Sequence, residues 1–394
     1  MKYKLIFIFA FAILFFPVET DAAIPKLSQA PKLEISGWIP YWRKATGTAD
    51  ALLHIDAFTE INPFGYTVKN DGTLADTAKM DEEPWTTLIA EAKKRKIRVI
   101  PTVMWSNTEA IHRVLSNQKK RIALEDEITA LVKEKGFDGI DIDFEGKKAE
   151  TKNYFSTFLK GLYQRMGKKW VMCTIEARTP LNSRYDTIPE DIKYANDFTA
   201  INKYCDRVRI MTYDQGTIDV KLNRARMAPY IPVADPAWVE KVITLTMQTI
   251  PKKKLSIGIA TYGYEYRVTK LSEYGYRYDM QWALNPRYAI DLALSLGITP
   301  TRNGSNEIGF MYKPAVIASS VTGQETGSNN VVPTSTTAEN QPSKEISSSV
   351  NIVWWSDAKA IKDKVDLAKK LGVRGISIFK IDGGEDPLMW DVIK

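Results

Sequence analysis

The stretch Phe137-Asp-Gly-Ile-Asp-Ile-Asp-Phe-Glu-Gly146 alternates acidic with apolar side chains. Successive side chains of a β-strand point to opposite faces of its sheet. Asp141, Asp143 and Glu145 therefore share one face of this strand, and the other face carries Ile140, Ile142 and Phe144. The pattern predicts a strand with one apolar face and one face of carboxylates.

Three carboxylates on one strand face are costly in free energy. Like charges this close together raise the pKa of at least one member, so the cluster holds a proton near neutral pH. A general acid needs such a proton, and barrel enzymes place their active sites at the C-terminal ends of the strands. Glu145 is the last of the three carboxylates and is therefore the predicted acid.

Short apolar or β-branched segments alternate with segments of helical period along the chain. The predicted strands are Leu33–Ile39, Ile55–Ile61, Ile97–Val103, Phe137–Asp143, Trp170–Glu176, Val208–Tyr213, Leu255–Ala260 and Val373–Phe379. Apolar residues at three- and four-residue spacing predict helices at Pro84–Arg95, Arg121–Lys135, Tyr154–Arg165, Ala237–Met247 and Asp357–Leu371. These alternations predict an α/β fold, the closed (β/α)8 TIM barrel.

One interval breaks this spacing, between the seventh strand and the helix that follows it. Residues 263–352 are too many for a βα loop and contain apolar runs of their own, which predicts a small inserted α+β lobe. Within the lobe, residues 319–349 are rich in Ser, Thr, Asn and Gly and are expected to be disordered. The barrel is then expected to comprise residues 24–262, with strands 1–7, and residues 353–394, with helix 7 and strand 8.

Residues 1–23 have the pattern of a secretory signal peptide. The positive segment Met1–Lys4 precedes the apolar run Leu5–Phe16, and small residues follow at Thr20, Ala22 and Ala23. The run is shorter than the roughly 20 residues of a membrane-spanning helix, so cleavage is favoured over a membrane anchor. We expect a protein that is secreted, or periplasmic or in the cell envelope, with no stable membrane insertion after cleavage.

The small supply of histidine and cysteine disfavours several kinds of site. The chain has two histidines, His54 and His112, and two cysteines, Cys173 and Cys205. So few residues disfavour a Ser-His-Asp triad and a zinc site, and we expect no metal and no cofactor. Both cysteines lie beside apolar strands and are expected to be buried free thiols, although a single disulfide stays open.

The net charge of the chain is +7, which by itself suits nucleic acid, an anionic envelope polymer or a membrane surface. The basic and acidic residues are interleaved, however, and form no dense basic block with stacking aromatic residues. Nucleic acid is therefore not an expected partner, and we expect a monomer.

The segment Asp138–Glu145 has the pattern DxxDxDxE, which resembles the signature of the family 18 glycoside hydrolases, the chitinase family. Met211–Asp214 on the sixth predicted strand resembles the family's Met-x-Tyr-Asp segment. Tyr262-Gly263 introduces the insertion at a point where many members carry an α+β lobe. The resemblance extends from about Leu33 to the C-terminus.

The resemblance also implies a finer placement and a substrate class. Thr59–Phe64, Gly383–Pro387 and Trp390 look most like segments of bacterial N-acetylglucosaminidases of the spore cortex and other envelopes. The implied substrate is a polysaccharide that contains β-1,4-linked N-acetylglucosamine, in chitin or in peptidoglycan. The implied reaction retains the β configuration.

The resemblance implies a role for each matching residue. Glu145 would protonate the leaving oxygen, Asp143 would orient and stabilise the acetamido group of the substrate, and Asp141 would support Asp143. Tyr213 would hydrogen-bond the acetamido carbonyl as it attacks C1, so no protein nucleophile is expected. The implied substrate-binding residues are Met211, Asp214 and Phe379, and Asp138 is expected to be structural.

Two positions depart from the family pattern. Phe379 occupies the position on the eighth strand where many members have Trp, which leaves a smaller stacking face without an indole N–H. Arg209 shares the parity of Met211 and Tyr213 and should point into the barrel, where its expected partner is Glu176 or Asp141.

Several alternatives remain open at this stage. Core packing and sugar stacking are equally open for Trp38, Tyr41, Trp42, Tyr66 and Trp105. A role in the lobe core is favoured for Tyr262, Tyr264 and Tyr266. Besides an active glycosidase, the sequence allows a catalytically silent glycan-binding barrel or a protein that remodels the envelope with a partner.

Overall fold

The computed structural model describes residues 32–273, 275–314 and 349–393. The expected signal peptide, residues 1–23, lies outside this range, as does the expected disordered segment except for its last residue, Ser349. Among the described residues, no helix is both long enough and apolar enough to cross a membrane.

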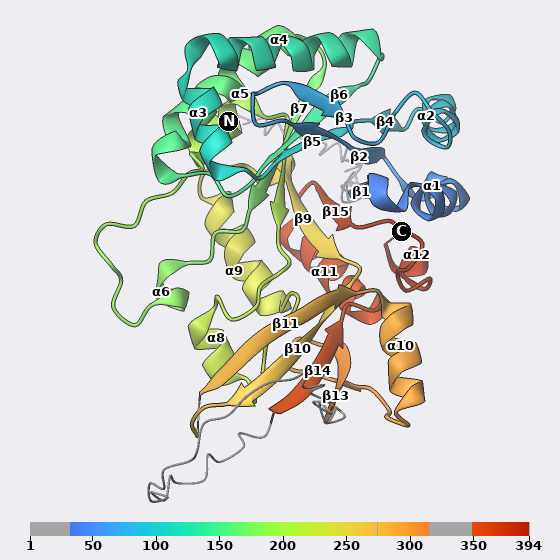
Figure 1. The fold of residues 1–394 in the computed structure, drawn as a ribbon, viewed down its shortest axis with the longest axis vertical. Helices are drawn as coiled ribbons and strands as arrows, with labels where there is room; N and C mark the ends of the chain where they lie inside the picture. The colour runs from blue at the N-terminus through green and yellow to red at the C-terminus, as the bar shows by residue number, and fades with distance from the viewer. Residues whose placement is uncertain (1–31, 274, 315–348, 394) are drawn as a thin grey trace, which may run out of the picture. The chain divides into compact units, whose positions relative to one another are not determined.

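Eight parallel strands form a closed barrel, which confirms the predicted (β/α)8 fold (Figure 1). Around the ring they are β1 (Glu34–Pro40), β2 (Glu60–Val68), β4 with β5 (Arg98–Val99 and Thr102–Trp105), β6 (Gly139–Phe144), β7 (Trp170–Glu176), β8 (Arg207–Met211), β9 (Leu255–Ala260) and β15 (Gly375–Phe379). The first strand, β1, pairs with β2 on one side and with β15 on the other, which closes the ring. A short strand, β3 (Leu74–Asp76), pairs antiparallel with β2 outside the ring.

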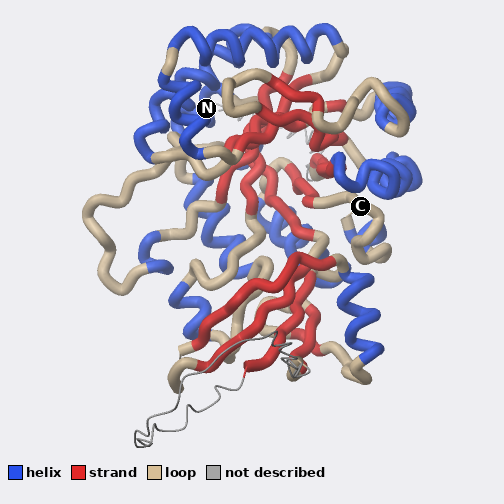
Figure 2. The backbone as a smooth tube through the Cα atoms, viewed as in Figure 1, coloured by secondary structure: helices blue, strands red, loops and turns tan. Residues whose placement is uncertain are grey.

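Helices surround the barrel, as the blue segments outside the red strands show in Figure 2. The predicted helices are present as α2 (Trp85–Lys94), α4 (Gln118–Glu134), α5 (Lys152–Met166), α9 (Pro236–Met247) and α11 (Ala358–Leu371). The structure adds helices that the sequence analysis did not identify, namely α1 (Lys44–Leu53), α3 (Thr108–Ser116), α6 (Leu181–Arg184), α7 (Phe198–Tyr204), α8 (Val220–Ala225) and α12 (Met389–Val392).

The two faces of β6 have the environments that its alternating sequence predicts. Ile140, Ile142 and Phe144 are fully buried. Phe144 stacks on Phe158 of α5, with ring centroids 5.3 Å apart, so this face packs against the helical layer outside the barrel. Burial of one such side chain stabilises the fold by about 2 kcal/mol. The apolar face thereby fixes the carboxylates on the inside of the ring.

The inserted lobe is an antiparallel sheet with one helix beside it. Its strands, in order across the sheet, are β11 (Tyr276–Leu284), β10 (Gly263–Lys270), β14 (Ser349–Trp355), β13 (Ile308–Tyr312) and β12 (Thr301–Arg302), and the helix is α10 (Pro286–Ser295). The register pairs Gly263 with Trp355. Residues 353–355, expected to belong to the returning barrel, are therefore part of the lobe sheet, because β14 continues to Trp355.

Two strand predictions need correction. In the expected strand Ile55–Ile61, residues Ile55–Ala57 form a 3-10 turn, and the strand begins only at Glu60. Ile55 is buried although it lies in this turn. An apolar residue is therefore needed here for burial and does not indicate a strand. The expected strand Ile97–Val103 is interrupted before Thr102. Pro101 lies in the interruption and has no N–H for a ladder hydrogen bond.

The expectation that the two cysteines are free thiols is wrong, and the disulfide left open by the sequence is present. Cys173 and Cys205 form a disulfide, with their Cα atoms 6.0 Å apart. Cys173 lies on β7, and Cys205 follows α7 directly, so the turn from helix to the next strand brings it beside β7. Both are fully buried, as expected, but they pair, because the chain returns to the same place after 32 residues.

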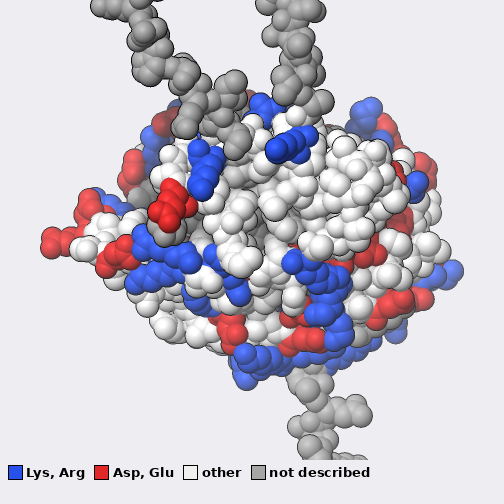
Figure 3. All heavy atoms as spheres, turned by 90° about the horizontal axis from the view of Figure 1, so that it is seen from below, with Lys and Arg blue, Asp and Glu red and all other residues white. Residues whose placement is uncertain are grey.

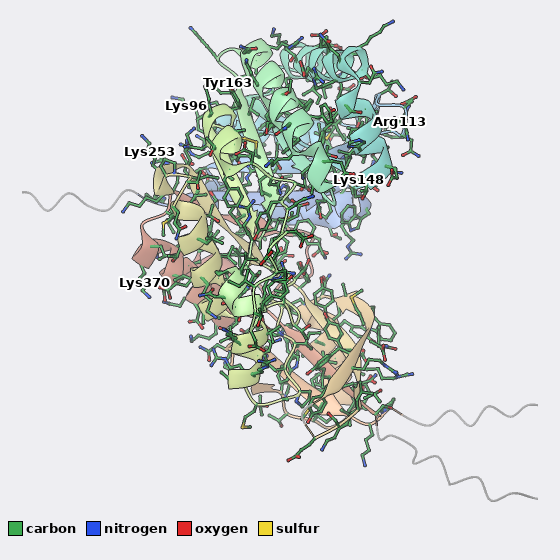
Figure 4. All side chains as sticks on the ribbon, turned by 90° about the vertical axis from the view of Figure 1, so that its left-hand side faces the viewer. Lys96, Arg113, Lys148, Tyr163, Lys253 and Lys370 are labelled. Carbon is green, nitrogen blue, oxygen red and sulfur yellow. A yellow bond between two sulfur atoms is a disulfide. The ribbon has the colours of Figure 1, made fainter. Side chains whose placement is uncertain are left out.

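Charged side chains are spread over the surface. Figure 4 shows Lys96, Arg113, Lys148, Lys253 and Lys370 on the outer surface of the barrel half. Some are paired, as Lys370 is with Glu240 at 2.8 Å. The face in Figure 3 mixes basic and acidic side chains around a broad uncharged area. The excess of basic residues therefore does not gather into one field on this face.

Candidate active site

Asp141 lies at the centre of the barrel, fully buried. One carboxylate oxygen accepts from the hydroxyl of Thr174 at 2.8 Å. The other accepts from the hydroxyl of Thr102 at 2.8 Å and from the indole N–H of Trp38 at 3.1 Å. Burial raises the pKa of Asp141 to about 6, although these hydrogen bonds oppose the rise. Asp141 is thus a fixed group that no substrate can reach.

Arg209 points into the same interior layer from β8. Its guanidinium lies 2.9 Å from a carboxylate oxygen of Asp141 and also contacts Glu60 of β2. Of the two partners expected for it, Asp141 is correct and Glu176 is not. The sequence analysis missed Glu60, because nothing local marks a glutamate that faces an arginine 149 residues further along the chain.

Asp143 is the next inward residue of β6 and is 4% exposed. Its Oδ1 atom is buried and has no hydrogen-bond partner within the described part of the chain. Burial, followed by the charges of Glu145 and Asp141, raises its pKa well above the ordinary value. An unpaired buried acceptor costs about 1–3 kcal/mol, and a hydrogen-bond donor brought to this oxygen would remove that cost.

Glu145 follows the end of β6, and its backbone N–H donates to the carbonyl of Trp105 at 2.8 Å. Its side chain is partly exposed. Burial raises the pKa of Glu145, the charges of Glu176 and Asp214 raise it further, and Lys147 opposes them. The carboxyl therefore holds its proton to a higher pH than an ordinary glutamic acid does.

Glu176, at the end of β7, holds the turn that follows Glu145. It accepts from the backbone N–H of Gly146 at 2.9 Å and from the amide of Asn196 at 2.8 Å. Gly146 has φ +63, a left-handed conformation that glycine adopts at little cost. The buried amine of Lys147 lies 3.5 Å from Glu176. The sequence analysis missed this arrangement except for the residues of the motif itself.

Tyr213 follows β8 and packs on Phe379 at the end of β15, with ring centroids 5.7 Å apart and planes 17° apart. It is 8% exposed. Burial, with the charge of Asp143 next, raises its pKa well above the ordinary value, so the hydroxyl keeps its proton as a donor. Met211 packs against the same small cluster. The structure therefore brings three predicted site residues together from two strands.

Asp214 has φ +56 and lies under two tyrosines from the start of the lobe. The hydroxyl of Tyr262 donates to its carboxylate at 2.7 Å, and the hydroxyl of Tyr264 donates to the same oxygen at 2.6 Å. These tyrosines, expected in the lobe core, are therefore bound to a predicted site residue. Their position directly after the seventh barrel strand was the available signal.

A cavity of about 380 Å³ opens beside this group. Asp214, Tyr262, Tyr264 and Phe379 line it, together with Trp42 from the loop after β1. Trp42 is 50% exposed, whereas Trp38, Tyr66 and Trp105 are each 2% exposed. Of the aromatic residues left open by the sequence, Trp42 is thus available for sugar stacking, and those three belong to the core.

Asp138 is not part of this arrangement. Its carboxylate accepts from the backbone N–H of Val99 at 2.8 Å and so joins β6 to β4 near the other end of the strands. Among the described residues, no group of three or more His, Cys, Asp or Glu side chains is placed to hold a metal ion.

Comparisons with known proteins found a matching family profile, similar chains and solved structures of the same fold. The sequence profile of the family described as Glycosyl hydrolases family 18 matches residues 32–384. The chain is 25% identical over 317 residues to an uncharacterized glycosylase of Bacillus subtilis, YvbX, with 78% of each chain covered. It is 25% identical over 342 residues to the cortical fragment-lytic enzyme of the same organism, covering 84% of this chain and 66% of the enzyme.

Solved structures share the fold. The spore cortex-lytic enzyme SleL of Bacillus megaterium matches with a TM-score of 0.66 and 22% identity, over 92% of this chain and 73% of that one. A chitinase of Chromobacterium violaceum matches with a TM-score of 0.67 and 19% identity, over 92% of this chain and 98% of that one.

Proposed function

The chain belongs to glycosyl hydrolase family 18, and from that membership we propose that it cleaves β-1,4-linked N-acetylglucosamine glycans of the chitin or peptidoglycan type, with retention and with help from the substrate's acetamido group. The observation that carries the proposal is the Oδ1 atom of Asp143, which is buried and has no hydrogen-bond partner among the described residues. An acetamido N–H of the substrate supplies the donor that this buried acceptor lacks. No other carboxylate is needed as a nucleophile.

The first step breaks the glycosidic bond. The proton held by Glu145 passes to the glycosidic oxygen, and the bond from C1 to that oxygen breaks. The acetamido oxygen forms a bond to C1 from the opposite face, which gives an oxazolinium ion. Asp143 accepts the N–H and stabilises the positive charge, while the hydroxyl of Tyr213 donates to the acetamido oxygen.

The second step opens this ring. Water attacks C1 from the face that the leaving group occupied, and the Glu145 carboxylate takes the proton from the water. The bond from C1 to the acetamido oxygen breaks, which restores the acetamido group. Two inversions at C1 leave the product in the β configuration.

The substrate class rests on relatives and on the site together. The relatives include a cortical fragment-lytic enzyme, and the structural neighbours include a chitinase. Chitin and peptidoglycan both contain the β-1,4-linked N-acetylglucosamine that the acetamido mechanism requires. Residues 1–23 have the pattern of a signal peptide, so we place the action outside the cytoplasmic membrane, in the envelope or in the medium.

The test compares wild type with Glu145→Gln on chitotetraose, on its fully deacetylated form and on peptidoglycan. Mass spectrometry identifies the products, and time-resolved NMR identifies the first-formed anomer. We expect cleavage by wild type only where the N-acetyl group is present, with the β anomer first. An initial α anomer, or similar rates on the deacetylated sugar, would contradict the mechanism.

A further inference from the structure

The cleft continues beyond Phe379 into a second cavity of about 490 Å³. The two cavities share the lining residues Trp42, Ala283, Leu284, Asn285 and Lys380. They are therefore parts of one cleft between the barrel and the lobe. The second cavity is therefore continuous with the space beside Phe379.

Exposed aromatic rings form two sides of the second cavity. Trp42 comes from the short turn η1 (Tyr41–Arg43) after β1, Trp282 from β11 and Tyr288 from α10. Trp282 is 48% exposed and Tyr288 is 46% exposed, and their rings meet edge to face at 6.5 Å. Large exposed aromatic faces on both the barrel and the lobe suit a sugar ring between them.

The accessible charge in this cavity is positive. Among the described residues that line it, Asp382 is the one carboxylate; its side chain is 2% exposed, and Lys380 bonds to it and to Asn285. The side chain of Arg43 is 47% exposed, and its closest acidic atom in the described chain is an Asp382 oxygen at 4.0 Å. Lys380 pairs with the Asp382 carboxylate, so the N–H groups of Arg43 remain available to a ligand.

The half-exposed guanidinium of Arg43 can contact a negative charge on a glycan that lies in this cavity. N-acetylmuramic acid differs from N-acetylglucosamine by a lactyl ether, which carries a free carboxylate when no peptide is attached. Such acidic sugars alternate with N-acetylglucosamine in a peptidoglycan strand. The planar guanidinium of arginine binds a carboxylate through two parallel hydrogen bonds, which lysine cannot do.

Resting on the glycosidase function above, we propose that the second cavity is a subsite for a carboxylate-bearing amino sugar, and that Arg43 binds its carboxylate. The preferred substrate is then a peptidoglycan strand stripped of peptide, with N-acetylglucosamine beside Phe379 and N-acetylmuramic acid between Trp42 and Trp282. Chitin occupies the same cleft without the ionic contact.

The kinetic test uses two tetrasaccharides, chitotetraose and an alternating N-acetylglucosamine–N-acetylmuramic acid strand with free lactyl groups. We expect Arg43→Gln to lower the ratio of kcat/KM for the acidic over the neutral substrate about tenfold, through KM. Arg43→Lys should keep part of this preference. Trp282→Ala should lower kcat/KM for both substrates alike, since stacking on an aromatic ring does not depend on the charge of the sugar.

Arg277→Gln is the matched control, because Arg277 is an exposed arginine on β11 that pairs with Asp279 and does not line the cavity. It should leave the ratio unchanged. Arg43→Gln variants with an unchanged ratio, whether both rates stay or both fall together, would overturn the assignment.

A binding measurement separates this proposal from the catalytic one. In the Glu145→Gln background, calorimetry compares both tetrasaccharides with and without Arg43→Gln. If Arg43→Gln weakens binding of the acidic sugar alone, by about tenfold, the subsite is supported. This holds even if wild type hydrolyses neither substrate, because a lack of hydrolysis would contradict only the glycosidase assignment. Equal binding of the two sugars in both proteins would overturn the subsite.

Discussion

Three carboxylates of one strand face acquire three different environments. Asp141 is saturated with hydrogen bonds and an arginine, Asp143 keeps an unpartnered oxygen, and Glu145 reaches the open end of the barrel. In the mechanism proposed above, distance along the strand decides which group supports, which stabilises charge and which transfers the proton. Spacing of two residues thus places like side chains in unlike environments.

The acid assignment has a direct test. Glu145→Gln replaces the carboxyl by a nearly isosteric amide that has no transferable proton, so the fold and glycan binding should persist. We expect kcat to fall by roughly 100- to 10,000-fold. Steady-state kinetics with a thermal melt checks both halves, and near-wild-type turnover would refute the assignment.

The neighbours of Glu145 should move its pH profile in opposite directions. The proposed reaction needs the protonated acid, so kcat should fall as the pH rises through the pKa of Glu145. Glu176 raises that pKa and Lys147 lowers it. Glu176→Gln should therefore move the alkaline limb of kcat to lower pH, and Lys147→Gln should move it to higher pH.

The pH–kcat profiles of the two variants and wild type provide the measurement, with circular dichroism to confirm folding. Because the shifts have opposite signs, a general loss of stability cannot mimic both. Limbs that move in the same direction, or that coincide with wild type, would show that these charges do not tune the acid.

At the scale of elements, the sequence predicts the limits of a strand best where the strand is buried on both of its faces. Trp170–Glu176 and Leu255–Ala260 are strands with the predicted limits, because their apolar runs are buried between helices and a filled barrel. The strand prediction failed at Ile55, because a buried 3-10 turn requires the same kind of apolar residue as a strand does. Periodicity does not separate these two causes over three residues.

The site residues likewise fall into those that local sequence predicts and those that it does not. The motif around Asp143 is local in sequence, so its carboxylates and their common face were predictable. Glu60, Tyr262 and Tyr264 contribute through contacts that cross the barrel or come from the lobe. Such contacts depend on the register of distant strands, which a single sequence does not encode in any local pattern.

One glycine links an element to the chemistry. A Cβ atom at Gly258 of β9 would lie 2.5 Å from the carbonyl oxygen of Ile210 and 2.9 Å from Cε1 of Tyr213. Gly258→Ala should therefore displace the Tyr213 ring, lower kcat and cost about 1–3 kcal/mol of stability. Ser256→Ala on the same strand adds no atom there and is the control.

Kinetics and chemical denaturation measure these effects. If Gly258→Ala and Ser256→Ala both keep the wild-type kcat, the position of the Tyr213 ring does not depend on the absence of a side chain at residue 258.

At the scale of the molecule, the disulfide joins β7 to the end of α7. It closes a loop of 32 residues, and loss of such a cross-link costs roughly 4 kcal/mol in the chain-entropy description. The double variant Cys173→Ala/Cys205→Ala should unfold at lower denaturant, while kcat stays near wild type because neither cysteine touches the cleft. Wild type in reducing agent should match the variant, and equal midpoints in all three samples would contradict the prediction.

The pairing of β1 with β15 has a consequence for the order of folding. Glu34 faces Gly375 in this pair, so the ring cannot close until the chain as far as Gly375 is available to fold. The described lobe strands all lie between Gly263 and Trp355, so all of them precede the strand that closes the barrel. Loss of that strand would leave an open sheet with two free edges, and we expect a chain cut before Gly375 to aggregate rather than to survive as a smaller barrel.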